Sequence, residues 1–379
     1  MPRPTFVTID LAALTENARL IRSLAGSSQV MAAVKANAYG HGMTLCAKTL
    51  EPMVDAFAVA FCEEATQLRV AGIRKPILIL EGPFDLQDMI EIANLDCWPV
   101  VHSVEQITLL ETAISQRKCE PTQIIWLKVD TGMHRLGISP EEVSSATDKL
   151  QQLGITDIRL LSHLAHAEAP DASLTQRQLQ RWTIAADNFG GQVSLKNSAG
   201  LITIADTPRQ LQNAEWIRPG YMLYGGAIDA RYIESSTNND RDTHIDTHAV
   251  MELCSRIMAI RTISEGETVG YGGRWTATRS SRIATIPVGY GDGYPRTAEN
   301  GTPVIIEGVR CPLVGRVSMD MITVDVTACT QATIGSPVQL WGPQLSVDEI
   351  ARHANTIGYE LLTRLSERVP RVVRPITTP

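Results

Sequence analysis

The sequence predicts an α/β fold with two domains, a (β/α)8 TIM-like barrel followed by a C-terminal mostly β domain. Three observations favour it. The chain has 379 residues, too many for one ordinary domain and about enough for two. Between about residues 30 and 220, short β-branched and aliphatic runs alternate with segments of helical period, as in repeated βα units. After Gly226 the pattern changes to short alternating runs separated by glycine, which is typical of a small antiparallel β domain.

Eight apolar runs in the first part are the expected barrel strands, at residues 30–34, 57–61, 77–80, 98–102, 124–129, 158–163, 193–195 and 216–218. Helices are expected between them, among others at 103–115 with Ser103 as N-cap, 140–153 and 174–189. Eight parallel strands with crossover helices suggest a closed barrel. An open doubly wound sheet is the alternative, but the first run leads into Lys35 and no G-x-G-x-x-G fingerprint opens the next helix.

The second part of the chain has a different pattern of polar and apolar residues. The polar stretch 229–246 is expected to be a linker or long loop. Alternating runs then predict strands at 282–288, 302–307, 322–326 and 337–341, and two closing helices at 346–355 and 359–366. The strand-like start of the chain lies outside the eight runs and is expected to pair with this domain. We place the barrel in residues 10–235 and the β-rich domain in residues 236–379 together with an N-terminal strand in residues 1–9.

Composition and charge restrict the classes of function. With 44% hydrophobic and 20% charged residues, the chain is typical of a globular protein. Its net charge of -7 argues against nucleic acid or an anionic membrane as partner and favours a small-molecule substrate. No apolar run reaches the ~18 residues that span a bilayer, and the first ten residues lack a signal-peptide core, so we expect a cytoplasmic protein. The seven cysteines are scattered without a C-x-x-C pair and are expected to be reduced.

Polar residues end several of the expected barrel strands, and active sites of such barrels lie at these ends. The candidates are Lys35, Lys128, Asp130, His163, Asn197, Ser198 and Arg218. The small apolar run before Lys35 would desolvate its amine and favour the neutral nucleophile, although a lysine at a strand end can also simply reach solvent. Arg218 carries a permanent charge suited to a pyridine nitrogen or a phosphate; an interdomain ion pair is the other interpretation.

Two segments together predict a phosphate-binding cup. In residues 197–200 a serine hydroxyl stands at the start of a short helix, where free N–H groups can hold a phosphate, although a plain N-cap has the same pattern. Gly220 and Tyr221 can supply further N–H donors. His163 has no complete metal-ligand set near it, so we expect no metal and interpret it as an orienting residue. Tyr271 lies between glycines, as turn tyrosines do, but that backbone can also direct a phenol into a neighbouring site.

These residues, in this order, resemble the alanine racemases, a barrel-type family of enzymes that use pyridoxal phosphate (PLP). Residues 34–42, VKANAYGHG, resemble the cofactor-lysine signature. The likeness covers essentially the whole chain, through residues 128–137, 162–163, 197–200, 218–220, 270–272, 289–296, 314–321, 359 and 368–371. The resemblance implies interconversion of L- and D-alanine, supplying D-alanine for peptidoglycan, by a homodimer with shared active sites.

The resemblance also implies a role for each candidate residue. Lys35 would hold PLP as a Schiff base and move the Cα proton on one face, and Tyr271 of the partner subunit would serve the other face. The implied phosphate ligands are Tyr39, Ser198, Tyr359 and the backbone N–H groups of Gly220 and Tyr221. Arg218 would bind the pyridine nitrogen, and His163 would link it to Tyr271 of the partner subunit. Arg135 and the partner's Met319 would bind the substrate, supported by Lys128, which resembles a family lysine that is carbamylated, and by Asp320.

Three alternatives remain open. A broad-specificity racemase acting on serine or larger amino acids would share this fold and chemistry but would need a roomier entrance. Leu164 and Lys196 depart from the family pattern, and such departures can alter the pocket edge or entry. PLP-dependent decarboxylases share both domains but would replace Tyr271 and supply a partner cysteine where Ser318 stands. A PLP-binding carrier without turnover would be a single barrel, which the second domain disfavours.

Overall fold

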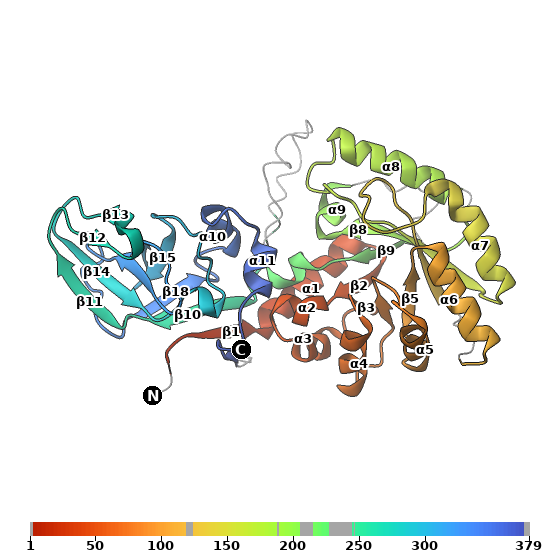
Figure 1. Ribbon diagram of the computed structural model, residues 1–379, viewed down its shortest axis with the longest axis horizontal. Coiled ribbons are helices and arrows are strands. Elements are labelled where there is room, and N and C mark those ends of the chain that lie inside the picture. Colours follow the sequence, from red (N-terminus) through yellow and green to blue (C-terminus); the bar gives the residue numbers. More distant parts are fainter. Residues whose placement is uncertain are drawn as a thin grey trace.

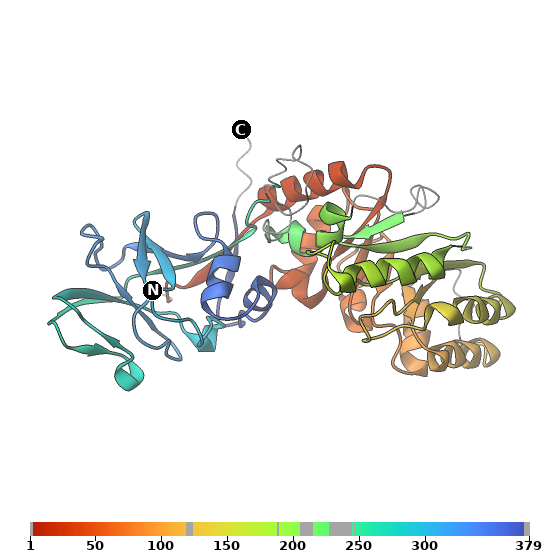
Figure 2. The same ribbon diagram turned by 90° about the horizontal axis from the view of Figure 1, so that it is seen from above.

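The computed structural model describes residues 3–118, 124–187, 189–204, 215–226, 245 and 247–374. Two units lie end to end along the long axis, a barrel surrounded by helices and a β-rich unit (Figures 1 and 2). The barrel is closed and has eight strands. The predicted fold class is therefore confirmed, and the closed barrel excludes the open doubly wound sheet.

The barrel strands follow one another in chain order. They are β2 (Gln29–Ala33), β3 (Ala56–Val59), β4 (Ile77–Ile79), β5 (Trp98–Val101), β6 (Ile124–Lys128), β7 (Asp157–Leu161), β8 (Val193–Asn197) and β9 (Glu215–Arg218). All neighbours pair in parallel, and β9 closes the barrel on β2 through Trp216 and Ile217. Every expected run forms a strand. Because the strands are parallel, their C-terminal ends share one rim.

Helices cover the outside of the barrel. They are α1 (Leu11–Ala25), α3 (Met43–Leu50), α4 (Cys62–Val70), α5 (Leu86–Asn94), α6 (Val104–Ser115), α7 (Val143–Gln152), α8 (Ser173–Ala186) and the short α9 (Ser198–Thr203). Ser103 caps α6 as predicted, its hydroxyl accepting the Gln106 N–H at 3.4 Å. Two expectations need correction: residues 140–142 form a separate 3-10 turn before α7, and α8 ends at Ala186, short of residue 189.

The β-rich unit contains a six-stranded sheet in the order β16-β15-β18-β10-β1-β19 and a three-stranded sheet in the order β11-β14-β17. Their bounds are β1 (Phe6–Asp10), β10 (Met251–Arg256), β11 (Ala259–Ile263), β14 (Ser281–Ile286), β15 (Pro303–Ile306), β16 (Val309–Pro312), β17 (Ile322–Asp325), β18 (Pro337–Trp341) and β19 (Arg371–Arg374). The N-terminal β1 pairs with β10 and β19. Helices α10 (Val347–His353) and α11 (Gly358–Thr363) face the barrel (Figure 1). The expected linker at 229–246 lies outside the described residues, except for Ile245.

A buried arginine lies among three tryptophans inside the barrel, towards the N-terminal ends of its strands. The Arg159 guanidinium carbon is 4.9, 5.6 and 5.7 Å from the ring centroids of Trp98, Trp126 and Trp216. Asp157 accepts two hydrogen bonds from the same guanidinium, at 2.9 and 2.7 Å. This end of a barrel contributes stability rather than catalysis. We therefore interpret this cluster, called the cation–π plug below, as a stabilising core of the barrel that closes its N-terminal end.

Replacing this arginine tests the plug. Arg159→Ala is expected to lower the free energy of unfolding by about 2–4 kcal/mol, because desolvated cation–π contacts and the packing of the arginine stem are lost together. Arg310→Ala is the matched control, since its two bonds to Glu349 lie on the surface and such pairs contribute about 1 kcal/mol or less. Chemical denaturation of both variants measures the difference. Equal losses in the two variants would contradict the interpretation.

Candidate active site

Cationic side chains gather at the C-terminal rim of the barrel. Lys35 follows β2, Lys128 ends β6 and Arg218 ends β9. Burial and, to a smaller extent, the positive charges of Arg218, Arg135, Lys128 and Lys35 together lower the pKa of His163 to about 3. Since all four cations act on one imidazole, the structure brings these five predicted residues into one site, where His163 is a neutral ring.

Arg218 is held rigidly inside this site. One guanidinium nitrogen donates to the Ser194 hydroxyl and another to the Ser162 carbonyl at 2.5 Å. Burial lowers the pKa of Arg218 to about 10, so the group remains charged at neutral pH. These partners lie within the barrel itself, which favours a ligand-binding cation over an interdomain ion pair. An oriented, desolvated guanidinium is suited to an aromatic nitrogen.

The segment after Lys35 has an unusual backbone. Residues 36–39 all have φ between 52° and 56°, so the short element α2 (Lys35–Tyr39) is a left-handed turn. Such geometry costs roughly 1–2 kcal/mol per residue for L-amino acids. Glu64 at the start of α4 compensates by accepting the Ala36 N–H at 2.6 Å and the Ala60 N–H at 2.7 Å. Sequence reasoning missed Glu64, whose signal is an acidic residue three positions after Phe61 at a helix start.

Hydroxyls and backbone N–H groups form the cup that the sequence predicted. Ser198 begins α9, and its hydroxyl accepts the N–H groups of Gly220 at 2.9 Å and Met222 at 3.3 Å. A Cβ at Gly220 would lie 2.4 Å from the Tyr39 hydroxyl, so only glycine allows this approach. Burial raises the pKa of Tyr39 to about 12 and also raises that of Tyr359, which keeps both phenols as donors. A nucleophilic amine, a guanidinium and a cup of donors together fit PLP.

Tyr271, Met319 and Asp320 are not brought to this site within one chain. Tyr271 lies between β12 (Thr268–Val269) and β13 (Trp275–Thr276), at the end of the β-rich unit away from the barrel (Figures 1 and 2). Tyr271 is 71% exposed and Met319 is 53% exposed. Asp320 accepts a hydrogen bond from Arg368 at 2.7 Å.

A cationic cavity of about 710 Å³ lies close to Tyr271, and sequence reasoning missed it. Arg274, Arg296 and Arg316 line it, and the positive charges of Arg274 and Arg296 lower the pKa of Arg316. The Arg316 backbone nitrogen would lie 3.3 Å from a Cβ at Gly270, next to Tyr271. The cavity therefore attracts anions beside that tyrosine.

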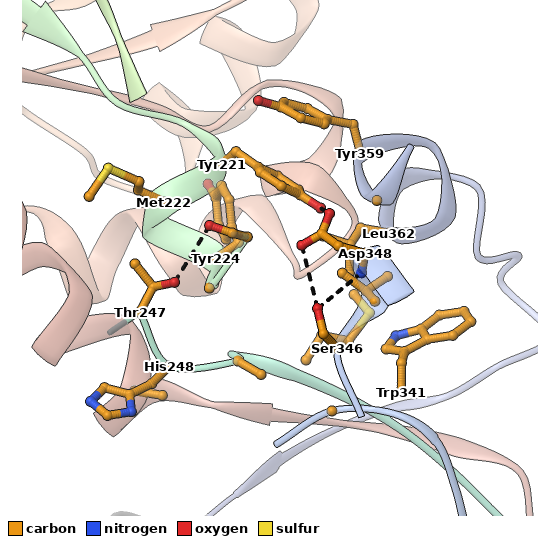
Figure 3. A pocket seen from close by; sticks show the side chains of 18 of the residues that line it. Tyr221, Met222, Tyr224, Thr247, His248, Trp341, Ser346, Asp348, Tyr359 and Leu362 are labelled. Atoms are coloured by element: carbon orange, nitrogen blue, oxygen red, sulfur yellow. Dashed lines mark hydrogen bonds between the residues drawn. The ribbon is translucent and has the colours of Figure 1, made fainter. Parts of the chain in front are cut away.

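A second cavity, of about 1060 Å³, lies where the barrel meets the β-rich unit. Figure 3 shows Tyr221 and Tyr224 from the barrel beside Asp348 and Tyr359 from the other unit. The Tyr221 hydroxyl donates to Asp348 at 2.6 Å. Asp348 is another residue that sequence reasoning missed, because nothing in the local pattern pairs it with a tyrosine 127 residues earlier.

The two residues that depart from the family pattern, Leu164 and Lys196, are both buried. Leu164 is 2% exposed and packs in the hydrophobic cluster between the strands and α8. The Lys196 amine lies 3.4 Å from the Glu215 carboxylate, and both residues are buried. Neither departure from the family pattern therefore supports a wider pocket.

Two histidines with lowered pKa values predict a loss of stability in acid. Burial lowers the pKa of His41 to about 4 and that of His163 to about 3, from 6.5. Below about pH 6.5 the unfolded chain binds more protons, so stability falls as the pH falls, by about 2 kcal/mol per histidine by about pH 5. We expect the melting temperature to decrease less steeply over this range in His41→Asn. His248→Asn, at a largely exposed position, is the control, and an unchanged slope in His41→Asn would contradict the prediction.

The fold and the donor set define a barrel enzyme that binds PLP at its C-terminal rim. Comparison with known proteins agrees with this class. Residues 9–227 match the family model of the alanine racemase N-terminal domain, and residues 250–373 match that of the C-terminal domain.

Similar proteins cover nearly the whole chain. An alanine racemase of Xanthomonas axonopodis is 45% identical over 98% of this chain and 96% of its own, and a catabolic alanine racemase of Pseudomonas putida is 41% identical over 97% and 98%. The biosynthetic alanine racemase of Pseudomonas aeruginosa superposes with a TM-score of 0.87 at 38% identity, covering 98% and 100%. The Bartonella henselae alanine racemase with covalently bound pyridoxal phosphate has a TM-score of 0.84 at 29% identity, covering 98% and 100%.

The chain belongs to the alanine racemase family. It is a PLP-dependent amino acid racemase, an isomerase. Within the described residues, no helix is long and apolar enough to cross a membrane. The same part of the chain contains no group of three or more His, Cys, Asp or Glu side chains placed to hold a metal.

Proposed function

We propose that this enzyme interconverts L- and D-alanine with two bases, Lys35 and Tyr271 of the partner subunit. One observation carries the proposal: Lys35 stands among the cationic side chains at the barrel rim, whereas Tyr271 is exposed at the end of the β-rich unit away from the barrel. A second copy of the chain can supply the phenol that one chain alone leaves unused. The alanine racemases that resemble the chain over nearly its whole length support alanine as substrate.

Each residue at the rim then has a chemical task. PLP, when bound, withdraws electrons from the substrate Cα and makes its proton acidic. Lys35 holds or moves that proton on one face, and Tyr271 of the partner subunit does so on the other. Arg218, fixed by Ser194 and Ser162, binds the pyridine nitrogen. His163, which its lowered pKa keeps neutral, links Arg218 to the phenol.

The remaining predicted residues bind the two anionic groups. Arg135 and the backbone N–H of the partner's Met319 hold the substrate carboxylate. The phosphate lies in the cup of Tyr39, Ser198, Tyr359, Gly220 and Tyr221. Burial lowers the pKa of Lys128 to about 8, so a useful fraction of its amine is neutral and can add to carbon dioxide, with loss of a proton, to form a carbamate that positions Arg135. Asp320 supports the partner tyrosine, Tyr271.

A head-to-tail homodimer satisfies this arrangement. Large apolar side chains are exposed at both ends that would meet: Phe61, Phe84 and Val104 beside the barrel rim, and Tyr271, Met319 and Met321 on the β-rich unit. Phe61 and Phe84 also contact each other, with ring centroids 5.9 Å apart. Exposed apolar groups of this size favour burial against a partner. Two-fold symmetry would then produce two identical shared sites.

We assign the enzyme to the supply of D-alanine for peptidoglycan. L- and D-alanine have equal free energies, so the direction of net conversion follows from which enantiomer the cell provides. A solved neighbour is named biosynthetic and a relative is named catabolic, in agreement with one chemistry serving both directions. The broad-specificity alternative shares this fold and chemistry, and the test of serine and larger amino acids below distinguishes it from an alanine racemase.

The direct test is conversion of pure D-alanine to L-alanine by the purified protein, together with the visible absorbance of its bound cofactor. We expect the absorbance and rapid racemisation of alanine, with serine and larger amino acids converted much more slowly. If the cofactor absorbance is present but alanine is not racemised, the enzyme must act on another substrate. Absence of the absorbance after addition of PLP would overturn the role of Lys35.

A further inference from the structure

A chain of contacts connects the β-rich unit to the phosphate cup (Figure 3). Tyr221 begins the 3-10 turn η3 (Tyr221–Tyr224) of the barrel and is buried. Its ring stacks on the ring of Tyr359 from α11, with centroids 3.8 Å apart and an interplanar angle of 11°. Its hydroxyl donates to the Asp348 carboxylate on α10 at 2.6 Å. Tyr359 in turn lies beside Tyr39, with ring centroids 6.1 Å apart.

Two glycines make room for the Tyr221 side chain. A Cβ at Gly358 would lie 1.7 Å from the Tyr221 hydroxyl and 2.6 Å from the Asp348 carboxylate. A Cβ at Gly226 would lie 2.1 Å from the Tyr221 ring. Any larger residue at either position would displace the tyrosine. Both glycines therefore permit this one placement of the Tyr221 side chain, and Gly358 directly precedes Tyr359 in the sequence.

The hydrogen bond between Tyr221 and Asp348 is of the strong kind. Burial and the nearby carboxylate both raise the pKa of Tyr221, so the phenol keeps its proton and donates it. Hydrogen bonds to a charged acceptor are about twice as strong as neutral ones. Asp348 is itself oriented, because its backbone N–H donates to the Ser346 hydroxyl at 3.1 Å. The position of the Tyr221 ring is therefore determined at its hydroxyl end by the β-rich unit.

We propose that Asp348 and the Tyr221 side chain are positioning residues for Tyr359: Asp348 holds the Tyr221 ring, and that ring holds Tyr359 by stacking so that its hydroxyl faces the phosphate cup. The inference rests on the proposed function, which assigns Tyr359 to the phosphate. It extends the cofactor site to α10. The pair sets the affinity for the phosphate end of PLP and leaves proton transfer at the opposite end unchanged.

The test compares two cofactors on the full-length enzyme. PLP is removed from the purified holoenzyme, and the affinities for PLP and for pyridoxal, which lacks the phosphate, are measured by the absorbance of the bound form. We expect Tyr221→Phe to weaken PLP binding about tenfold, the size of one lost hydrogen bond to a charged group, and to leave pyridoxal binding unchanged. Asp348→Asn should have a smaller effect in the same direction, because the amide oxygen still accepts a hydrogen bond.

Matched variants separate positioning from general destabilisation. Tyr294→Phe removes another buried phenol of the β-rich unit, and Glu349→Gln neutralises the acid next to Asp348; both should retain wild-type affinity for PLP. The melting temperature of the cofactor-free protein should be similar in all variants. A loss of pyridoxal affinity equal to the loss of PLP affinity in Tyr221→Phe would indicate a merely structural role and overturn the proposal.

Tyr359→Phe distinguishes failure of the inference from failure of its premise. We expect this variant to weaken PLP binding, and we expect the double variant with Tyr221→Phe to be little weaker than either single one, because both act on one contact. If Tyr359→Phe weakens PLP binding and Tyr221→Phe does not, the inference is overturned while the phosphate assignment stands. If Tyr359→Phe leaves PLP affinity unchanged, the assignment of Tyr359 fails and the inference fails with it.

Discussion

Replacing Tyr271 with phenylalanine is expected to reduce alanine racemisation by about 10²–10⁴-fold, the contribution typical of one positioned proton-transfer group. The phenol is 71% exposed in the isolated chain, so its removal should leave the fold intact. Cofactor absorbance should also remain, because Lys35 and the phosphate cup belong to the barrel. The measurement is the rate of conversion from each enantiomer, with absorbance recorded on the same samples.

The two faces of the substrate provide the control for this variant. We propose that the tyrosine acts on L-alanine and the lysine on D-alanine, which is the assignment that the resemblance to the alanine racemases implies. In deuterated water, Tyr271→Phe should therefore still exchange the Cα proton of D-alanine, whereas exchange from L-alanine should be lost. Tyr294→Phe, a buried phenol elsewhere in the same unit, should behave as wild type. Equal loss of exchange from both enantiomers would contradict separate bases.

Much of the fold could be predicted from the sequence because its signals are local. Each barrel strand is a short apolar run, several of these runs end in a polar residue, and the hydrophobic period changes between strand and helix. Lys35, Lys128, His163 and Arg218 were predicted to meet because parallel strands deliver their last residues to one rim. The structure places these side chains together, as the combined effect on the pKa of His163 indicates.

The missed residues act through distant contacts. Glu64 is needed because residues 36–39 form a left-handed turn, and no local propensity predicts four such residues in succession. In the local sequence pattern, Arg159 is a single polar residue within a strand. In the structure, three tryptophans from other strands surround its guanidinium. Asp348 meets Tyr221 only because α10 packs beside the barrel. Conversely, Leu164 and Lys196 were judged by family pattern alone, and their side chains are directed into buried contacts.

Two inactive variants are expected to restore activity when they share a dimer. Lys35→Ala removes the covalent attachment, and Tyr271→Phe removes the second base, so each alone should lose at least about 10²-fold. In a shared-site dimer, a hybrid contains one site with both Lys35 and Tyr271 and one site with neither. Random pairing makes about half of all dimers hybrids, so the mixture should recover roughly a quarter of the wild-type activity. Co-expression with two different tags isolates the hybrid for the assay.

The size of this recovery decides where the second base comes from. If Tyr271 served Lys35 of its own chain, every site in the hybrid would lack one group and the mixture would remain inactive. The geometry argues against that outcome, because Tyr271 lies at the end of the β-rich unit away from the barrel that carries Lys35. Separately purified variants that are mixed without subunit exchange should stay inactive, which controls for two monomeric activities that merely add. Recovery in the isolated hybrid alone would therefore establish an active site built from two chains.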